Sequence, residues 1–213
     1  MALSNPRDVP PLRRRAPGSH SAIARWVKWR THLVATALWA CCTALVASPA
    51  IAADDAAALE RTVKAAFVYK FLSYVEWPAG AFARPDAPIV IGVYGADDIG
   101  SELSQVVPGR TIADRPLEVR RVKEADPLTG LHVLFIGRAE SNRIRELAPV
   151  ARQNSILVIS ESDNALDSGS IINLVLADGR VRFEVALDAA EKSGLKLSSR
   201  MLALALVVRT GGS

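Results

Sequence analysis

Three short apolar runs constrain the fold of this chain more than any other feature of its sequence. They are Ile89–Tyr94 (IVIGVY), Leu131–Ile136 (LHVLFI) and Ile156–Ser160 (ILVIS), and none contains a formally charged residue. Such runs are typical of strands buried on both faces of a sheet. Amphipathic segments at 97–106 and 141–152 separate them and predict helices. We therefore expect an α/β fold: a mixed, mostly parallel sheet with helices on both faces, in a Rossmann-like three-layer arrangement.

A long amphipathic segment precedes these runs. From Ala56 to Trp77, apolar residues that include Leu59, Val63 and Phe67 recur at steps of three and four, which predicts a helix with these residues on its apolar face. Pro78 cannot continue a helix, so we expect it to end at Trp77.

Two segments between the helices and the buried runs have other patterns. Residues 79–88 are rich in alanine, glycine and proline and predict a loop. Leu117–Val122 mixes apolar and charged side chains and predicts a strand nearer an edge of the sheet.

The C-terminal part of the chain has a different pattern. Asp178-Gly179 lies between two alternating runs, which predicts a β-hairpin that adds antiparallel strands at one edge. Leu187–Ser193 predicts a helix closed by Gly194. Ser199–Val208 predicts a last helix, apolar on nearly every side and, at about ten residues, too short to span a membrane. We expect this helix to be buried against the sheet or partly covered by a partner.

The N-terminus has the organisation of an export signal. Residues 1–30 carry seven basic side chains and one acidic side chain, and the uncharged run Leu33–Val46 follows. Ala50-Ile51-Ala52 is a small-x-small cleavage site. The apolar run has about 14 residues, fewer than the roughly 20 of a spanning helix. We predict a cleavable signal peptide at 1–52 and a single exported α/β domain at 53–213.

Removal of this leader changes the chemistry that the chain can carry. The leader holds seven of the 26 basic and one of the 22 acidic residues, so the remainder has a net charge of about −2. This balance argues against a nucleic-acid partner.

Both cysteines, Cys41 and Cys42, also lie in the leader, where the bulky Trp39 disfavours Cys41 as a lipid acceptor. His132 is the one histidine left, so we expect no metal, no cofactor and no enzymatic activity.

Two glycine-containing turns are candidates for anion sites. Gly92–Gly100 (GVYGADDIG) matches neither common phosphate-loop pattern, and Asp97 and Asp98 would repel a phosphate, so we interpret it as a turn between strand and helix. Gly137-Arg138 also precedes a predicted helix, which leaves an anion site there as an alternative to a plain turn.

The stretch FLSYVEWP places Glu76 beside Trp77 at the expected helix end. Glu76 is predicted either to form an ion pair, with Arg182, Arg200 or Arg61 as its partner, or to belong to a ligand- or partner-binding site. Trp77 is the one tryptophan outside the leader. It either packs in the core or anchors a partner protein.

Two stretches together resemble the YfiR-like family of periplasmic regulators: AAFVYKFLSYVEWP at 65–78 and VRFEVALDAAEKSGLKLSSRMLALA at 181–205. The family motifs are an acid-Trp-Pro end of the first helix, a DG-x-V-x-F-E hairpin and an AG-L-K-(I/L)-S helix connection. The matching segments are 76–78, 178–184 and 193–198. The resemblance covers nearly all of residues 60–208.

This resemblance implies a non-catalytic role. It implies a protein that binds and represses an inner-membrane diguanylate cyclase through the periplasmic region of that enzyme, which lowers cyclic di-GMP and biofilm formation. It also implies a releasing protein in the outer membrane or bound to peptidoglycan, and a homodimer. The disulfides of the best-known members have no counterpart here, because the chain after residue 52 contains no cysteine.

Two functions therefore remain open from the sequence. In the first, apolar surface on the last helix or hairpin docks a membrane receptor, and we expect Ile172 and Leu174 to be exposed there. In the second, the chain is a periplasmic small-ligand binding module that signals to another membrane receptor, with a cleft near Trp77 and converging arginines. The candidate binding residues are Glu76, Trp77, Ile172, Leu174, Arg182 and Arg200.

Overall fold

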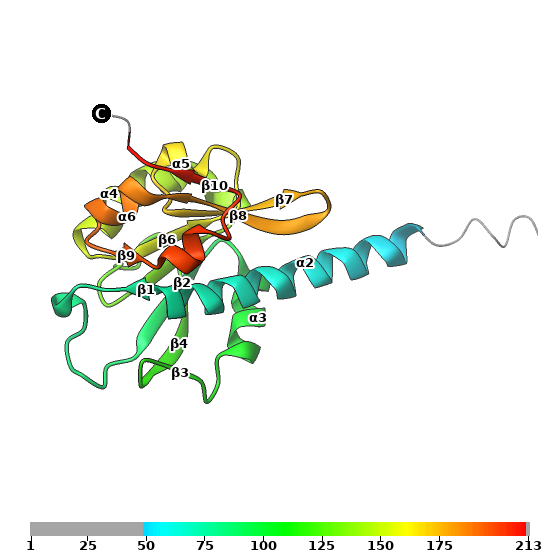
Figure 1. Cartoon of the computed structure of the whole chain (residues 1–213). Coiled ribbons are helices and arrows are strands. Elements are labelled where there is room, and N and C mark those ends of the chain that lie inside the picture. The colour runs from blue at the N-terminus through cyan, green and yellow to red at the C-terminus, as the bar shows by residue number, and fades with distance from the viewer. Residues whose placement is uncertain (1–48, 212–213) are drawn as a thin grey trace, which may run out of the picture. The chain divides into compact units, whose positions relative to one another are not determined.

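The computed structural model describes residues 49–211, and an eight-stranded sheet lies at its centre (Figure 1). The strands are β2 (Ile89–Tyr94), β3 (Thr111–Ile112), β4 (Arg115–Val122), β5 (Val133–Ile136), β6 (Leu157–Ser160), β7 (Ile172–Ala177), β8 (Arg180–Ala186) and β10 (Val207–Arg209). Their order is β10-β8-β7-β6-β5-β2-β4-β3. Five neighbouring strands, β4, β2, β5, β6 and β7, run parallel to one another. β8 is antiparallel to β7, β3 is antiparallel to β4, and β10 is parallel to β8. The predicted mixed, mostly parallel sheet is confirmed.

Helices cover both faces of this sheet. They are α2 (Pro49–Phe71), α3 (Asp97–Val106), α4 (Ile144–Gln153), α5 (Ala165–Ser168), α6 (Leu187–Lys192) and α7 (Ser199–Leu202), with 3-10 turns at Leu72–Tyr74, Ala79–Ala81 and Arg138–Arg143. Successive residues of β5 point to opposite sides: Val133 and Phe135 pack with α2 and α3, and Leu134 and Ile136 pack with α4 and α5. The sheet is therefore the middle layer of three, as predicted.

The predicted hairpin is formed by β7 and β8. Its turn residues Asp178 and Gly179 both have positive φ, 50° and 68°, as a two-residue hairpin turn requires. The register pairs Leu174 with Phe183. The hairpin lies near the edge of the sheet, and β10 pairs with the outer side of β8.

The first helix ends earlier than predicted. α2 stops at Phe71, and after one 3-10 turn the chain enters a short strand, β1 (Val75–Glu76), which pairs antiparallel with β9 (Lys196–Leu197). The amide of Ser198 donates to the carbonyl oxygen of Tyr74 at 2.9 Å. The predicted helix end at Trp77 was wrong. The distant strand β9 supplies hydrogen-bond partners for the backbone of Val75 and Glu76, so these residues form a strand.

The buried face of α2 agrees only in part with the predicted one. Phe71 is buried and Phe67 packs against the core, as predicted, whereas Leu59 is 66% exposed. Lys64, Ala65 and Val68, which were not part of the predicted apolar face, are buried as well.

The last predicted helix is wrong over most of its length. α7 covers Ser199–Leu202 only; a turn follows, and residues 207–209 form β10. The amide of Leu206 donates to the carbonyl oxygen of Phe183 at 2.8 Å, where the segment joins the edge of β8. A short run that is apolar on every side has no periodicity to separate helix from strand, and the open edge of β8 decided the outcome.

Residues 1–48 and 212–213 lie outside the described part of the chain. The signal peptide at 1–52 and the single domain at 53–213 therefore stay predictions. By internal contacts the chain divides into two units, Met1–Ala52 and Ala53–Ser213.

Candidate functional site

Trp77 belongs to an aromatic cluster with Phe82, His132 and Arg115. The Trp77 and Phe82 rings meet edge to face at 6.1 Å, and Phe82 stacks on His132 at 4.3 Å. The guanidinium of Arg115 covers the Phe82 ring at 3.8 Å. The indole Nε1–H of Trp77 donates to the carbonyl oxygen of His132 at 3.3 Å. This aromatic cluster ties the loop at 79–88 to the ends of β2 and β5.

His132 holds the cluster with both of its ring nitrogens. Nδ1 accepts from the amide of Val90 at 3.1 Å, so the proton of the neutral ring is on Nε2, which donates to the carbonyl oxygen of Ala81 at 3.1 Å. Burial lowers the pKa of His132 below its ordinary value, and the positive charge of Arg115 acts in the same direction. Both nitrogens are thus engaged in fixing backbone, which is a structural role.

A cavity of about 640 Å³ lies beside this cluster, lined by residues that include Glu76, Trp77, Phe82 and Arg115. Arg115 already donates from one nitrogen to the carbonyl oxygens of Arg84 and Ala87. The cleft that the sequence predicted near Trp77 is therefore present. The converging arginines are not, because Arg115 is its one arginine.

The predicted ion pair of Glu76 is absent from the described residues. Glu76 is exposed, and the ion pairs of residues 49–211 include none between it and Arg182, Arg200 or Arg61. Arg61 instead lies 3.9 Å from Asp98. Arg182 is exposed on the face of β8 opposite to Phe183, which packs in the core.

Ile172 and Leu174 are buried, with exposed fractions of 0% and 1%, so the expectation that they are exposed was wrong. Both lie on the face of β7 that meets the core containing Phe71 and Phe183. A strand with neighbours on both edges and a helix across its face has no room for a partner at these positions.

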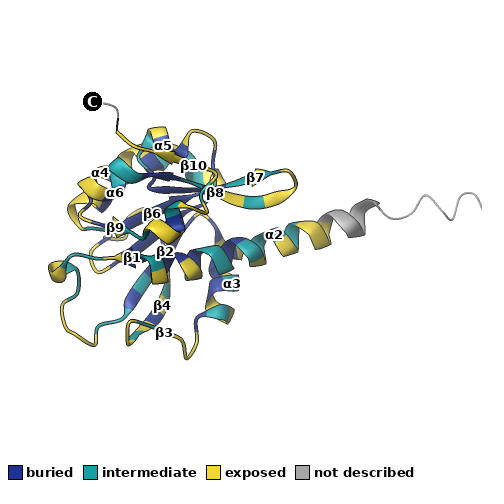
Figure 2. Cartoon of the chain, viewed as in Figure 1, coloured by how far each residue is buried: buried dark blue, intermediate teal, exposed yellow. Residues whose placement is uncertain are grey.

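Four exposed large apolar side chains lie instead close together in the residues that follow α7. Leu204, Leu206, Val207 and Val208 are 64%, 45%, 39% and 37% exposed, and we call them the C-terminal apolar segment (Figure 2). A cavity of about 370 Å³ adjoins Leu204 and is lined by Phe67, Phe183 and other apolar residues, with Lys70 as its one charged residue. The sequence indicated an apolar surface in this region but assigned it to a helix.

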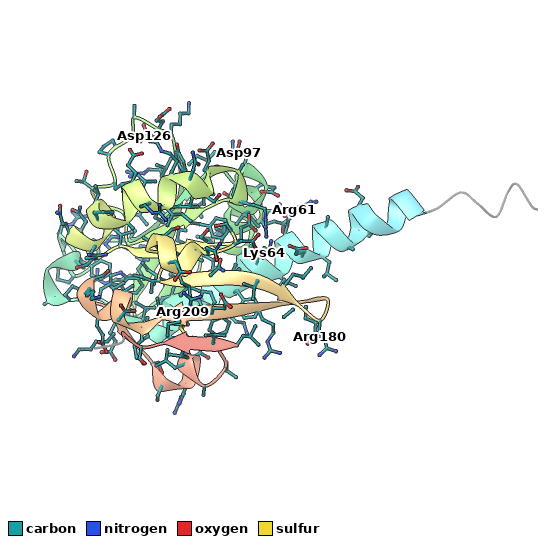
Figure 3. All side chains as sticks on the ribbon, turned by 90° about the horizontal axis from the view of Figure 1, so that it is seen from above. Arg61, Lys64, Asp97, Asp126, Arg180 and Arg209 are labelled. Atoms are coloured by element: carbon teal, nitrogen blue, oxygen red, sulfur yellow. The ribbon has the colours of Figure 1, made fainter. Side chains whose placement is uncertain are left out.

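At the carboxyl ends of parallel strands, where many α/β proteins bind ligands, this chain places an ion pair of its own after β6. Lys64 of α2, labelled in Figure 3, forms ion pairs with Glu60 and with Glu161 after β6, each at 2.5 Å. Burial alone would lower the pKa of Lys64, but the hydrogen bonds to Glu161 and Glu60 outweigh it, and the pKa is raised. The amide of Arg138 donates to the Glu161 carboxylate at 3.4 Å.

This carboxylate occupies the position that the anion-site alternative at Gly137-Arg138 required. The backbone there is also tightly packed, since a Cβ atom added to Gly137 would lie 2.2 Å from the carbonyl oxygen of Gly95. The turn at Gly137 is therefore structural.

Two further properties bear on function. Within residues 49–211, no group of three or more histidine, cysteine, aspartate or glutamate side chains is arranged to hold a metal ion. No helix in this described range is both long and apolar enough to cross a membrane.

The fold defines the class of the protein as a three-layer α/β domain. The family model described as YfiR/HmsC-like matches residues 61–206, and the chain belongs to this family. At the level of the family, this membership supports a periplasmic regulator of the cyclic di-GMP system. The resemblance found in the sequence is thereby confirmed.

Among solved structures, the chain is similar to a conserved domain protein from Vibrio cholerae O1 biovar El Tor. The identity is 13% and the TM-score is 0.44. The match covers 70% of this chain and 60% of that one.

Proposed function

We propose that this protein is an exported, non-catalytic regulator that binds an inner-membrane signalling protein, a diguanylate cyclase, and represses it. Bound regulator lowers cyclic di-GMP, and a releasing protein in the outer membrane or on peptidoglycan removes it. Membership of the YfiR/HmsC-like family supports regulation of this system, and the C-terminal apolar segment supports a protein partner.

The exposure of the C-terminal apolar segment carries the proposal. Leu204, Leu206, Val207 and Val208 together expose more apolar surface than scattered single residues do. β10 pairs with β8 along one of its edges, and it is the terminal strand in the order of the sheet. An edge strand with apolar side chains is suited to adding a strand or an apolar face of a partner.

The test compares two exposed apolar positions. Leu206→Asp lies in the C-terminal apolar segment, and Val150→Asp lies on α4 at a similar exposure, 45% against 44%. We expect Leu206→Asp to weaken binding to the periplasmic region of the cyclase by at least about tenfold and to raise cellular cyclic di-GMP, and Val150→Asp to do neither. Equal effects of both variants, or none, would remove the C-terminal apolar segment as the contact.

The cellular arm tests the function itself. Deletion of the gene should raise cyclic di-GMP, and restoration with the whole chain should reverse this, whereas a chain without residues 1–52 should not. Unchanged cyclic di-GMP after deletion would reject the cyclase as the target.

A second function is favoured by the cavity of about 640 Å³ at the aromatic cluster. Its aromatic wall and the single Arg115 suit a small aromatic or anionic molecule, and the protein would then report that ligand to a different membrane receptor. Isothermal titration with small aromatic carboxylates, against Phe82→Ala as control, distinguishes this function from the first.

A further inference from the structure

The cavity of about 370 Å³ beside Leu204 is an elongated groove along the C-terminal half of α2, and we call it the α2 groove. Helix α2, the turn after it, β8 and the segment of α7 contribute its lining, which consists of Val63, Ala66, Phe67, Lys70, Phe71, Tyr74, Phe183, Met201 and Leu204. From Val63 to Phe71 the helix rises by roughly 12 Å. The groove is therefore longer than a single side chain.

Three phenylalanines form the apolar base of the α2 groove. The ring of Phe71 lies 5.7 Å from Phe67 and 5.0 Å from Phe183, and Phe67 lies 5.8 Å from Phe183. Phe71 and Phe183 are buried, whereas Leu204 is 64% exposed. The base is thus fixed by packing in the core, and the rim is open to solvent. A site of this kind can take up an apolar ligand without rearrangement of its walls.

Lys70 gives the α2 groove its charge. It is the one charged side chain of the lining, and it is exposed. The ion pairs found within residues 49–211 do not include Lys70. A cationic ammonium beside an apolar wall matches a molecule with an apolar body and a single anionic head group.

The size of the groove limits the apolar body. A volume of about 370 Å³ lies at the low end of the range for small-molecule sites, roughly 300–1,000 Å³. It suits one alkyl chain, and it is too small for a lipid with two long chains. A carboxylate is the smallest anionic head group that forms a charge-assisted hydrogen bond with a lysine ammonium.

We infer that the α2 groove binds a medium-chain fatty acid, with the alkyl chain on Phe67, Phe71 and Phe183 and the carboxylate at Lys70. The groove shares no lining residue with the cavity at the aromatic cluster, so this is a different site. It does share Leu204 with the C-terminal apolar segment. A bound fatty acid therefore competes with the protein partner. This competition rests on the proposed function, whereas the binding of the fatty acid does not.

Isothermal titration of the exported protein with octanoate and decanoate, each kept below the concentration at which it forms micelles, tests the site. We expect one molecule to bind per chain. The affinity should rise by up to about fourfold for each added methylene, because each one buries further apolar surface. Absence of binding by both acids, or an affinity that does not depend on chain length, would overturn the inference.

Charge reversal tests the position of the head group. Lys70→Glu should weaken decanoate severalfold and should strengthen decyltrimethylammonium, which has the same chain and a cationic head group. Lys123→Glu is the matched control, because Lys123 is exposed and follows β4, near the other edge of the sheet. It should change neither affinity. Thermal unfolding checks that both variants keep the fold. Equal effects of the two variants would reject Lys70 as the partner of the carboxylate.

A competition experiment tests the regulatory consequence. Decanoate should release the periplasmic region of the cyclase from the wild-type protein at concentrations that leave the complex of the Lys70→Glu variant intact. A complex that persists with decanoate bound would reject the competition. If the proposed function is wrong, no complex forms even without decanoate, and the titration with octanoate and decanoate still decides whether the α2 groove is a fatty-acid site.

Discussion

The aromatic cluster around Trp77 and the C-terminal apolar segment are both rich in large apolar side chains. They differ in how far these side chains have partners within the protein. In the cluster, the indole nitrogen of Trp77 and both ring nitrogens of His132 have hydrogen-bond partners, and the Phe82 ring contacts both His132 and Arg115. In the C-terminal apolar segment, four large apolar side chains face solvent. A concentration of aromatic residues can thus have its polar atoms satisfied within the protein, while an apolar run at a sheet edge is open to a partner.

The core beneath both regions should show the largest effect on stability. Leu174→Ala removes a side chain that is 1% exposed and should lower the free energy of unfolding by about 3 kcal/mol. Leu176→Ala, two residues further along the same face of β7 and 60% exposed, is its control and should cost less than about 0.5 kcal/mol. Urea denaturation measures both, and similar losses would contradict the assignment of Leu174 to the core.

Removal of Trp77 should destabilise the protein without weakening its binding to a protein partner. Trp77→Ala loses the contact with Phe82 and the hydrogen bond to the carbonyl oxygen of His132, so we expect a loss of about 2–3 kcal/mol for this half-buried side chain. Titration with the periplasmic region of the cyclase should give an unchanged dissociation constant. If Trp77→Ala were stable but bound the cyclase more weakly, the partner contact would instead lie at the aromatic cluster.

His132 should make the stability of the cluster depend on pH. Its folded-state pKa lies below the ordinary value of 6.5, so the folded protein disfavours the charged ring. The stability contributed by the neutral ring is fully present above about pH 6.5 and is lost as the pH falls below 6.5 toward the lower folded-state pKa. His132→Phe keeps the stack on Phe82, loses both backbone hydrogen bonds at a cost of about 2 kcal/mol, and should flatten the profile between pH 7 and pH 5. Melting temperatures across this range measure the effect. If the melting temperature of His132→Phe depended on pH as steeply as that of the native protein, the pH dependence would come from other groups.

The C-terminal apolar segment should show the smallest change in stability and the clearest change in binding. Val208→Ala trims a side chain that is 37% exposed on β10 and should alter the free energy of unfolding by less than about 0.5 kcal/mol. Binding to the cyclase should nevertheless weaken by a few fold. A large loss of stability with no effect on binding would show that the segment is structural, like the aromatic cluster.

Much of the fold could be predicted from local patterns. The buried strands at 89–94, 131–136 and 156–160, the amphipathic helices between them and the turn at Asp178-Gly179 are strong signals, because each depends on residues close together in the chain. The candidate site was predicted less well. The cavity at Trp77 was expected and is present, but the arginines proposed for Glu76 lie elsewhere, because sequence spacing does not say which side of a sheet a distant residue reaches.

Two errors have the same physical cause. The residues after Leu202 were expected in a helix because that segment is apolar without a decisive periodicity. Ile172 and Leu174 were expected at the surface because the alternation of the hairpin does not show which of its faces is covered. Burial depends on what packs against a strand, and strand formation depends on a free partner edge. Neither the packing against a strand nor a free partner edge can be inferred from the residues of the segment alone.

Periodicity, turn chemistry and motifs were enough to predict the order of buried strands and helices, the hairpin turn and the family. Packing and pairing in the folded chain were needed to show that Ala65 of α2 is buried, that β10 extends the sheet beside β8, and that His132 binds the loop at 79–88 to the strands. These outcomes depend on hydrogen-bond partners and on packing between segments far apart in the chain. They therefore exist only once the sheet has formed.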